Sequence, residues 1–168
     1  MFKNIFSKKN DFSKIKLFFS DVDGTLTDAG MYYGENGIEY KRFNCHDGQG
    51  FELLRSRSIL VGLITSENTK MVADRAKKIG VDFLVQGEKY EGKLTAVIEI
   101  CKKNNISLNE VAYIGDDINC KELLESVGFR ACPKNAQGII KKIPNIIKLR
   151  KKGGDGAVRE FINLILGD

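Results

Sequence analysis

Two aspartates separated by one residue, Asp21 and Asp23, are the residues of this sequence best suited to catalysis. They follow the apolar run Leu17-Phe18-Phe19, and Gly24 comes directly after them. An aspartate is ionised at neutral pH and can act as a nucleophile, here at Asp21. A second carboxyl group at Asp23 can protonate a leaving group and later accept a proton from water. Gly24 permits a tight turn in which peptide N–H groups approach an anion.

Further polar residues follow later apolar runs of the chain. Thr65-Ser66-Glu67 follows the run 60–64, and Gly115-Asp116-Asp117 follows the run 110–114. Lys93 lies between these two groups, at the expected start of a helix. A hydroxyl at Thr65 or Ser66 can donate a hydrogen bond to a phosphoryl oxygen, and the Lys93 ammonium group supplies positive charge.

Several carboxylates gathered in one partly dry site would repel one another strongly. A hard cation with oxygen ligands relieves that repulsion, and Mg²⁺ is the cation that commonly bridges carboxylates and phosphate. We therefore predict a magnesium-dependent phosphomonoesterase. Asp21 attacks phosphorus to form an aspartyl-phosphate, and Asp23 is the acid/base that serves both half-reactions.

These residues must be positioned by strands that end at one edge of a sheet. Short apolar runs predict buried strands at 16–20, 60–64 and 110–114, with weaker strands at 82–85 and 127–131. Apolar stripes between and after them predict helices over 72–79, 94–101 and 158–165. We expect Asn68 or Thr69 to cap the first helix and Asp155 to cap the last. The alternation indicates an α/β fold with a doubly wound, mostly parallel sheet, whose carboxyl edge binds ligands.

One segment interrupts this alternation. Residues 31–33 and 38–43 flank Gly34-Glu35-Asn36-Gly37, a pattern that predicts an inserted β-hairpin just after the first strand. The sequence has no insertion large enough for a cap domain. We interpret residues 1–14 as an N-terminal extension and residues 15–168 as a single domain.

Composition limits the remaining classes of protein. The chain has 168 residues, is 42% hydrophobic and carries a net charge of +5. Its apolar runs fall short of the roughly 20 residues that span a bilayer, and residues 1–16 do not resemble a signal peptide. A cytoplasmic location without membrane partners is expected. The basic stretch Lys134–Lys152 lacks a nucleic-acid-binding motif, so we interpret it as a solvated surface or one that attracts an anionic substrate.

The single histidine, His46, excludes a metal site built from several histidines. Four cysteines are widely spaced and are predicted to be free thiols; they are Cys45, Cys101, Cys120 and Cys132.

The motif residues, taken in order, resemble those of the haloacid dehalogenase-like phosphatases, whose fold is Rossmann-like. Asp21-Val22-Asp23-Gly24-Thr25-Leu26-Thr27 is similar to their first motif, Thr65 to the second and Lys93 to the third. Gly115-Asp116-Asp117 is similar to the fourth. The resemblance implies that Asp21, the Asp23 backbone carbonyl and Asp116 bind Mg²⁺, with Asp117 as a supporting carboxylate.

The hairpin, the missing cap and the tail Lys152–Glu160 resemble one capless branch of this family. That branch includes phosphatases of 3-deoxy-manno-octulosonate 8-phosphate and of nonulosonate 9-phosphates, which serve lipopolysaccharide or sialic acid biosynthesis. The resemblance implies a homotetramer in which the hairpins associate and a neighbouring subunit covers each active site. The substrate is then a phosphorylated 3-deoxy-2-keto sugar acid.

Five positions depart from the octulosonate pattern. Ser66-Glu67 stands where Gly-Arg is usual, His46 where Arg is usual, Cys120 where Asp is frequent, and Asp155 where a basic residue is frequent. The nonulosonate enzymes resemble this chain at Glu67, which they pair with a lysine at the position of Lys78. We therefore expect Glu67 and Lys78 to select a nonulosonate 9-phosphate, with 3-deoxy-manno-octulosonate 8-phosphate as the alternative.

Other interpretations remain open at this stage. Glu67 and Lys78 could be an ordinary exposed pair, and His46 could face substrate or simply lie at the surface. A phosphotransferase or mutase would need a large cap, which this sequence lacks. A receiver domain carries its aspartate after a middle strand, whereas Asp21 follows the first. A non-catalytic binding module would be expected to lose the nucleophile, and Asp21 is present.

Overall fold

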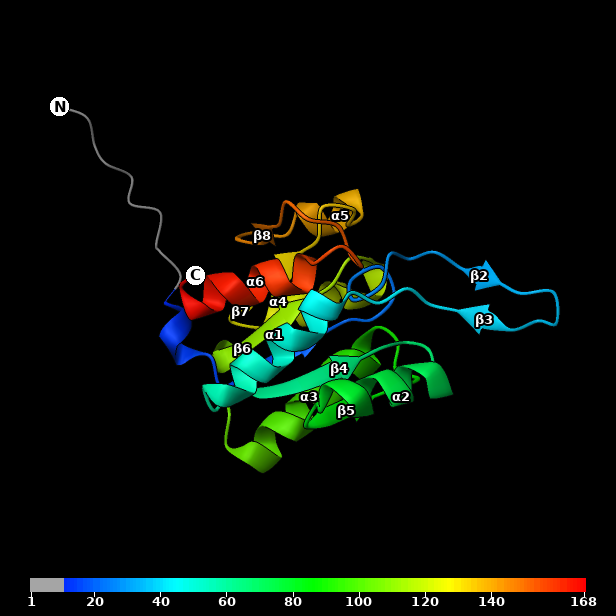
Figure 1. The fold of residues 1–168 in the computed structure, drawn as a ribbon. Coiled ribbons are helices and arrows are strands. Elements are labelled where there is room, and N and C mark those ends of the chain that lie inside the picture. The colour runs from blue at the N-terminus through cyan, green and yellow to red at the C-terminus, as the bar shows by residue number, and fades with distance from the viewer. Residues whose placement is uncertain (1–10) are drawn as a thin grey trace.

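A computed structural model describes residues 11–168, which fold around a six-stranded sheet with helices on both faces (Figure 1). The strand order is β5-β4-β1-β6-β7-β8, and every pairing in this sheet is parallel. The strands are β1 (Leu17–Ser20), β4 (Leu60–Ile64), β5 (Phe83–Val85), β6 (Val111–Ile114), β7 (Phe129–Cys132) and β8 (Ile147–Lys148). The predicted doubly wound α/β fold is confirmed.

Six α-helices and three short 3₁₀ helices accompany the sheet in the described range. The α-helices are α1 (Cys45–Ser56), α2 (Lys70–Ile79), α3 (Glu91–Asn104), α4 (Lys121–Ser126), α5 (Gly138–Lys141) and α6 (Ala157–Leu166). The 3₁₀ helices are η1 (Phe12–Lys14), η2 (Leu108–Glu110) and η3 (Ile118–Cys120).

The core has two layers because successive side chains of a strand point to opposite faces of the sheet. Phe18 of β1 points toward α1 and α6, where it packs against Phe51 and Phe161. Leu17 and Phe19 belong to the other layer, which is covered by α3, α4 and α5. Both faces of β1 are therefore buried, as its continuous apolar run predicts.

The register of the central strands brings the catalytic motifs together. Ser20, the last residue of β1, lies beside Leu63 of β4 and Ile114 of β6. The segments that begin at Asp21, Thr65 and Gly115 therefore leave the same edge of the sheet side by side.

The inserted hairpin is present, with shorter strands than its sequence pattern suggests. Strand β2 (Tyr32–Tyr33) pairs antiparallel with β3 (Glu39–Tyr40), and Gly37 adopts a positive φ of 71° in the turn. The hairpin extends away from the sheet beyond its carboxyl edge (Figure 1). Within residues 11–168 no other insertion stands over this edge, in agreement with the predicted absence of a cap.

Several elements were not predicted. Helix α1 contains Gly48 and Gly50, which weaken a helical pattern. A Cβ at Gly50 would lie 2.7 Å from Cδ1 of Ile162, so close packing of α1 on α6 explains this glycine. Strand β8 and helices α4 and α5 are too short to give a clear periodicity.

One of the two predicted helix caps is correct. The Thr69 hydroxyl accepts a hydrogen bond from the backbone N–H of Val72 at the start of α2. The predicted cap at Asp155 is wrong, because Asp155 pairs with Arg42 and Gly156 occupies the cap position. Asp47 of α1 instead accepts the backbone N–H of Arg159, at 2.7 Å, and so satisfies the first turn of α6.

The predicted N-terminal extension overlaps the described part of the chain only at residues 11–14. There the Phe12 ring lies 5.7 Å from that of Phe129 and packs against the core. Residues 1–10 lie outside the described range. No helix in the described range is long and apolar enough to cross a membrane.

Candidate active site

Asp21 is buried directly after β1, with both carboxylate oxygens engaged. Its Oδ1 accepts hydrogen bonds from Nζ of Lys93 at 2.9 Å and from the backbone N–H of Val22 at 2.8 Å. Its Oδ2 accepts a hydrogen bond from Sγ of Cys120 at 2.8 Å. These contacts fix the orientation that the carboxylate presents to a reacting phosphorus.

Lys93 lies in the first turn of α3 and its side chain is fully buried. Burial is the largest single influence and lowers the pKa of Lys93, but the contacts with Asp21 and Cys120 together outweigh it, so the pKa is raised. The ammonium group therefore stays charged beside Asp21. The predicted association of Asp21 with Lys93 is present in the structure.

Asp116 follows β6 and lies against the loop that carries Asp21. The Thr25 hydroxyl donates to its Oδ1 at 3.2 Å. Gly24 has a φ of 82°, and a Cβ there would lie 2.0 Å from Oδ2 of Asp116. Gly24 is therefore required both by backbone conformation and by the close approach of this carboxylate.

The two buried carboxylates form a donor set for a hard cation. Ligand atoms of Asp21, Asp116 and Cys120 all lie within 4.8 Å of one another. Burial, followed by the neighbouring Asp21 charge, raises the pKa of Asp116 to about 7. Burial also raises the pKa of Cys120, so its thiol stays protonated and donates to Asp21. Two carboxylates with a neutral thiol fit Mg²⁺, which prefers oxygen ligands.

Asp23 is half-buried at the mouth of the site. Nζ of Lys41 donates to its Oδ1 at 2.6 Å. Burial raises the pKa of Asp23 even though Lys41 acts in the opposite direction. A raised pKa favours the protonated form that a general acid needs.

A cavity of about 260 Å³ lies over these residues. Thr65 is buried at its base, and its hydroxyl accepts the backbone N–H of Glu67 at 3.2 Å. Ser66 accepts a hydrogen bond from Nδ2 of Asn119 at 2.8 Å. The cavity is lined by Asp21, Asp23, Ala29, Met31, Thr65, Ser66, Glu67, Asp116, Asp117 and Asn119.

Asp117 has a local structural role in addition to lining the cavity. Its Oδ1 accepts the backbone N–H of Ile118 at 2.7 Å, and Asp117 is the N-cap residue of η3.

The predicted pairing of Glu67 with Lys78 is wrong. Glu67 is bound instead by Lys41, whose Nζ lies 2.9 Å from Oε2 of Glu67. Lys78 is in the last turn of α2, whereas Glu67 precedes the first turn, so about 12 Å of helix rise separates them. Lys78 lines a different cavity, between α1 and α2, with Cys45, Gly48, Gln49, Glu52, Arg55, Arg75, Ile79 and Gly80.

His46 is exposed in the first turn of α1 and does not line the cavity over Asp21. Its backbone N–H donates to Oδ1 of the capping residue Asn44.

Within the described residues, the four cysteines are free, as predicted.

The glycine-rich tail supports the loop that carries Asp23 and Gly24. Asn135 donates from Nδ2 to the Gly24 carbonyl at 2.9 Å and accepts the N–H of Gly153 at 2.7 Å. A Cβ at Gly153 would lie 2.1 Å from the Gly24 carbonyl oxygen. The tail therefore needs glycine there because it passes directly against the active-site loop.

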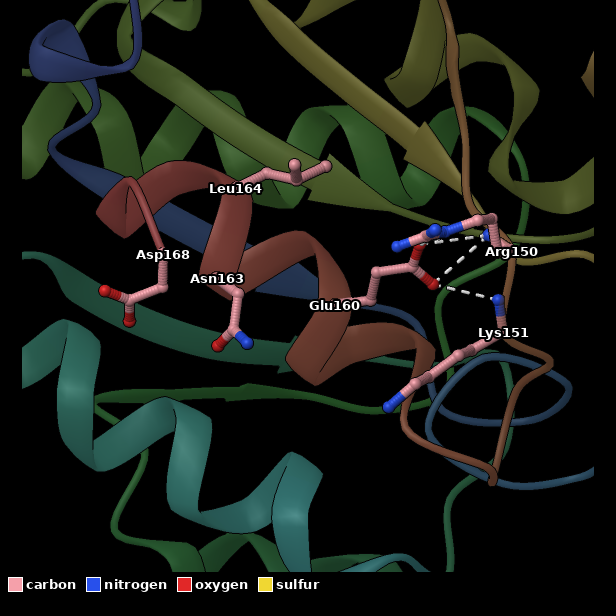
Figure 2. A pocket seen from close by; sticks show the side chains of 6 residues that line it. All are labelled: Arg150, Lys151, Glu160, Asn163, Leu164 and Asp168. Carbon is pink, nitrogen blue, oxygen red and sulfur yellow. Dashed lines mark hydrogen bonds and ion pairs between the residues drawn. The ribbon is translucent and has the colours of Figure 1, made fainter.

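A further surface cavity lies beside α6 (Figure 2) and contains none of the motif residues. There Glu160 accepts the backbone N–H groups of Arg150 and Lys151 and pairs with the Arg150 side chain. Glu160 thus attaches the end of the basic stretch Lys134–Lys152 to α6.

Two residues of the site were missed in the sequence. Lys41 contacts Asp23 across 18 positions of sequence and Glu67 across 26, and no local pattern marks it. Asn119 contacts Ser66 from the start of the η3–α4 segment. The sole available signal for Lys41 is its place at the exit of the predicted hairpin.

This fold, with a buried aspartate after β1, a buried lysine on α3 and an aspartate after β6, defines a phosphatase of the haloacid dehalogenase class. A family model described as haloacid dehalogenase-like hydrolase matches residues 87–161. The 3-deoxy-D-manno-octulosonate 8-phosphate phosphatase of Escherichia coli K12 is 37% identical over 152 residues, covering 90% of this chain and 79% of that enzyme. The chain therefore belongs to the haloacid dehalogenase-like hydrolases, in the branch of these phosphatases.

Solved structures show the same relationship. The Moraxella catarrhalis 3-deoxy-D-manno-octulosonate 8-phosphate phosphatase, in complex with a magnesium ion, a phosphate ion and KDO, is 37% identical, with a TM-score of 0.86. The match covers 93% of this chain and 90% of that one. The cobalt-bound Haemophilus influenzae enzyme is 28% identical, with a TM-score of 0.86, covering 94% of this chain and 91% of that one.

Proposed function

We propose that this protein hydrolyses 3-deoxy-D-manno-octulosonate 8-phosphate to the free sugar acid and phosphate. The observation that carries the proposal is the buried Asp21–Lys93 pair beside Asp116, in a chain 37% identical to an enzyme of that activity. A nonulosonate 9-phosphate, the substrate first favoured, has less support. The matched relatives that we compared act on the octulosonate, and the expected Glu67–Lys78 pair does not form.

The residues divide the reaction into two steps. The Asp21 carboxylate attacks phosphorus to form an aspartyl-phosphate, and Asp23 protonates the sugar oxygen as the P–O bond breaks. Asp23 then takes a proton from the water that hydrolyses the aspartyl-phosphate, which regenerates Asp21 and releases phosphate. Lys93 and the hydroxyl groups of Thr65 and Ser66 stabilise charge on the transferring group.

Magnesium would be held by Asp21, Asp116 and, by resemblance, the backbone carbonyl of Asp23. When bound, it neutralises charge on the phosphoryl oxygens and on the two buried carboxylates. Burial, followed by the neighbouring Asp21 charge, raises the pKa of Asp116 to about 7, and a bound cation would favour the ionised carboxylate. The Moraxella catarrhalis relative in complex with a magnesium ion supports the same choice of cation.

We also propose that the protein acts as a homotetramer. The hairpin exposes apolar side chains that a single chain leaves uncovered, including Tyr33, Ile38 and Tyr40, which are 52–66% exposed. A hairpin partner from a second copy would cover them and would stand over the open cavity. Tyr33→Glu should reduce the assembly measured by sedimentation, whereas Tyr90→Glu, at an exposed site outside the hairpin, should not. A wild-type monomer would refute this proposal.

The substrate proposal is tested by phosphate release from a panel of phosphorylated sugar acids in the presence of Mg²⁺. We expect the highest kcat/KM for 3-deoxy-D-manno-octulosonate 8-phosphate. A clear preference for a nonulosonate 9-phosphate would overturn the choice of substrate but leave the phosphatase assignment in place.

A cytoplasmic location stays a prediction from the sequence.

A further inference from the structure

Lys41 is a buried cation surrounded by carboxylates. Its side chain is only 1% exposed although it follows directly after the hairpin strand β3. Nζ lies 2.6 Å from Oδ1 of Asp23, 2.9 Å from Oε2 of Glu67 and 3.4 Å from Oε1 of Glu39. A lysine ammonium group has three N–H donors, and here three carboxylates surround it. Hydrogen bonds to Asp23 and Glu67 use two of these donors, whereas Oε1 of Glu39 forms an ion pair with Nζ but accepts no hydrogen bond.

The carboxylates around Lys41 come from three separate parts of the fold. Asp23 is on the loop after β1, Glu67 is on the loop after β4, and Glu39 is on the hairpin. Asp23 and Glu67 also line the cavity above Asp21, where a substrate would lie. Lys41 therefore connects the acid/base to a residue that is placed to meet the sugar.

Without Lys41, the carboxylates of Asp23 and Glu67 would share this partly buried region with no cation between them. Mutual repulsion would favour rotation of Asp23 away from its present position. A misplaced acid/base loses most of its catalytic advantage, because proton transfer requires hydrogen-bond distance and alignment.

We propose that Lys41 is a positioning residue that holds Asp23 toward the leaving group and couples its placement to sugar recognition by Glu67. Contact between a sugar hydroxyl and Glu67 then acts on the same ammonium group that orients Asp23. This inference rests on the proposed acid/base role of Asp23, but it does not depend on which sugar acid is the substrate.

The first test compares leaving groups in Lys41→Met. An alkyl phosphate needs protonation of its leaving oxygen, whereas 4-nitrophenyl phosphate releases a stable phenolate. Single-turnover release of the leaving group should slow by roughly 100-fold or more for an alkyl phosphate and by less than about tenfold for the aryl phosphate. KM should change little. Equal losses for both substrates would overturn the positioning role.

Two further variants separate positioning from folding. Lys41→Arg keeps the charge but changes the donor geometry, so we expect an intermediate loss with the same bias against the alkyl phosphate. Lys16→Met removes an ion pair with Glu110, away from the site, and serves as the matched control. It should show no bias between leaving groups. If Lys41→Met fails to fold, the leaving-group bias of Lys41→Arg decides the question.

A double-mutant cycle tests the coupling to Glu67. We expect Glu67→Gln and Lys41→Met to be non-additive in kcat for the sugar-acid phosphate, with the double variant little worse than Lys41→Met alone. Additive losses would remove the coupling while leaving the positioning of Asp23 intact. If wild type hydrolyses no sugar-acid phosphate, the proposed function fails, but the leaving-group comparison can still be made with simple alkyl and aryl phosphates.

Discussion

Cys120 donates its thiol proton to Oδ2 of Asp21, with 2.8 Å between sulfur and oxygen, while Lys93 binds the other oxygen of the same carboxylate. Both oxygens of the Asp21 carboxylate are therefore restrained. The thiol is neutral, because burial raises the pKa of Cys120. An aspartate is frequent at this position in the resembling enzymes, so this chain replaces a carboxylate by a weak hydrogen-bond donor.

This contact predicts different effects for two small substitutions. Cys120→Ser keeps a donor in place and should retain kcat within a few-fold. Cys120→Ala removes the donor to a charged oxygen and should lower kcat by about 10- to 100-fold, the range expected for a lost hydrogen bond to an ion. Steady-state kinetics at saturating Mg²⁺ measure both, and equal activity of the two variants would show that the thiol does not orient Asp21.

Gly24→Ala should impair magnesium binding without unfolding the protein. The new Cβ would lie 2.0 Å from Oδ2 of Asp116 and must displace that carboxylate. Calorimetric titration should show Mg²⁺ affinity lowered by at least about tenfold, as expected when a ligand moves out of place. Gly37→Ala is the matched control, because Gly37 also has a positive φ but its Cβ would meet nothing within 4 Å. Equal effects on Mg²⁺ affinity would contradict the steric explanation.

Asp47 should make the protein less stable as pH rises through the mildly acidic range. Burial raises the pKa of Asp47 from its ordinary value of 3.8 to about 6. Between these values the folded state binds more protons than the unfolded state, so the free energy of unfolding decreases with rising pH. The difference corresponds to about 3 kcal/mol, lost between about pH 4 and pH 6.

Asp47→Asn tests this dependence because the asparagine side chain does not titrate. Its amide oxygen can still accept the backbone N–H of Arg159 in the first turn of α6. Denaturant unfolding at pH 4.5 and pH 6.5, at fixed Mg²⁺, gives the two free energies for each protein. The variant should lose less stability than wild type between the two pH values. A change in stability with pH that is the same in both proteins would exclude Asp47 as the group responsible.

Asp116→Asn should abolish the stabilisation that Mg²⁺ gives. A ligand that binds only the folded state raises the free energy of unfolding by about 2.7 kcal/mol at 100 times its dissociation constant. Wild type should therefore show a rise in melting temperature on addition of Mg²⁺, and EDTA should reverse it. Asp74→Asn, on the exposed face of α2, is the control and should respond like wild type. A normal Mg²⁺ response in Asp116→Asn would exclude that carboxylate as a ligand.

The sequence predicts where the candidate catalytic residues lie because each follows a strand or begins a helix. The runs before Asp21, Thr65 and Asp116 are apolar on both faces, and parallel pairing then brings their ends together. Lys93 is found for the same reason, as α3 begins beside that edge. These positions follow from the local sequence pattern and from the rule that open α/β sheets bind ligands at the carboxyl ends of their strands.

Other parts of the site depend on the path of the chain in space. Lys41 reaches Asp23 only because the chain returns from the hairpin to the sheet edge after β3, which no periodicity reveals. Lys78 lies in the last turn of α2, whereas Glu67 precedes the first turn. The expected pair between Lys78 and Glu67 therefore does not form. The side-chain acceptor for the first turn of α6 is Asp47, more than a hundred residues away in sequence, rather than the adjacent Asp155.

The role of Asp21 is tested most directly by phosphate release from 3-deoxy-D-manno-octulosonate 8-phosphate in the presence of Mg²⁺, measured for wild type and Asp21→Asn. Asparagine keeps the shape of the side chain but lacks the negative charge of the nucleophile, so we expect rapid release by wild type and a loss of more than about 10⁴-fold in the variant. Phosphate release by Asp21→Asn at a rate close to that of wild type would contradict the assignment of Asp21 as the nucleophile.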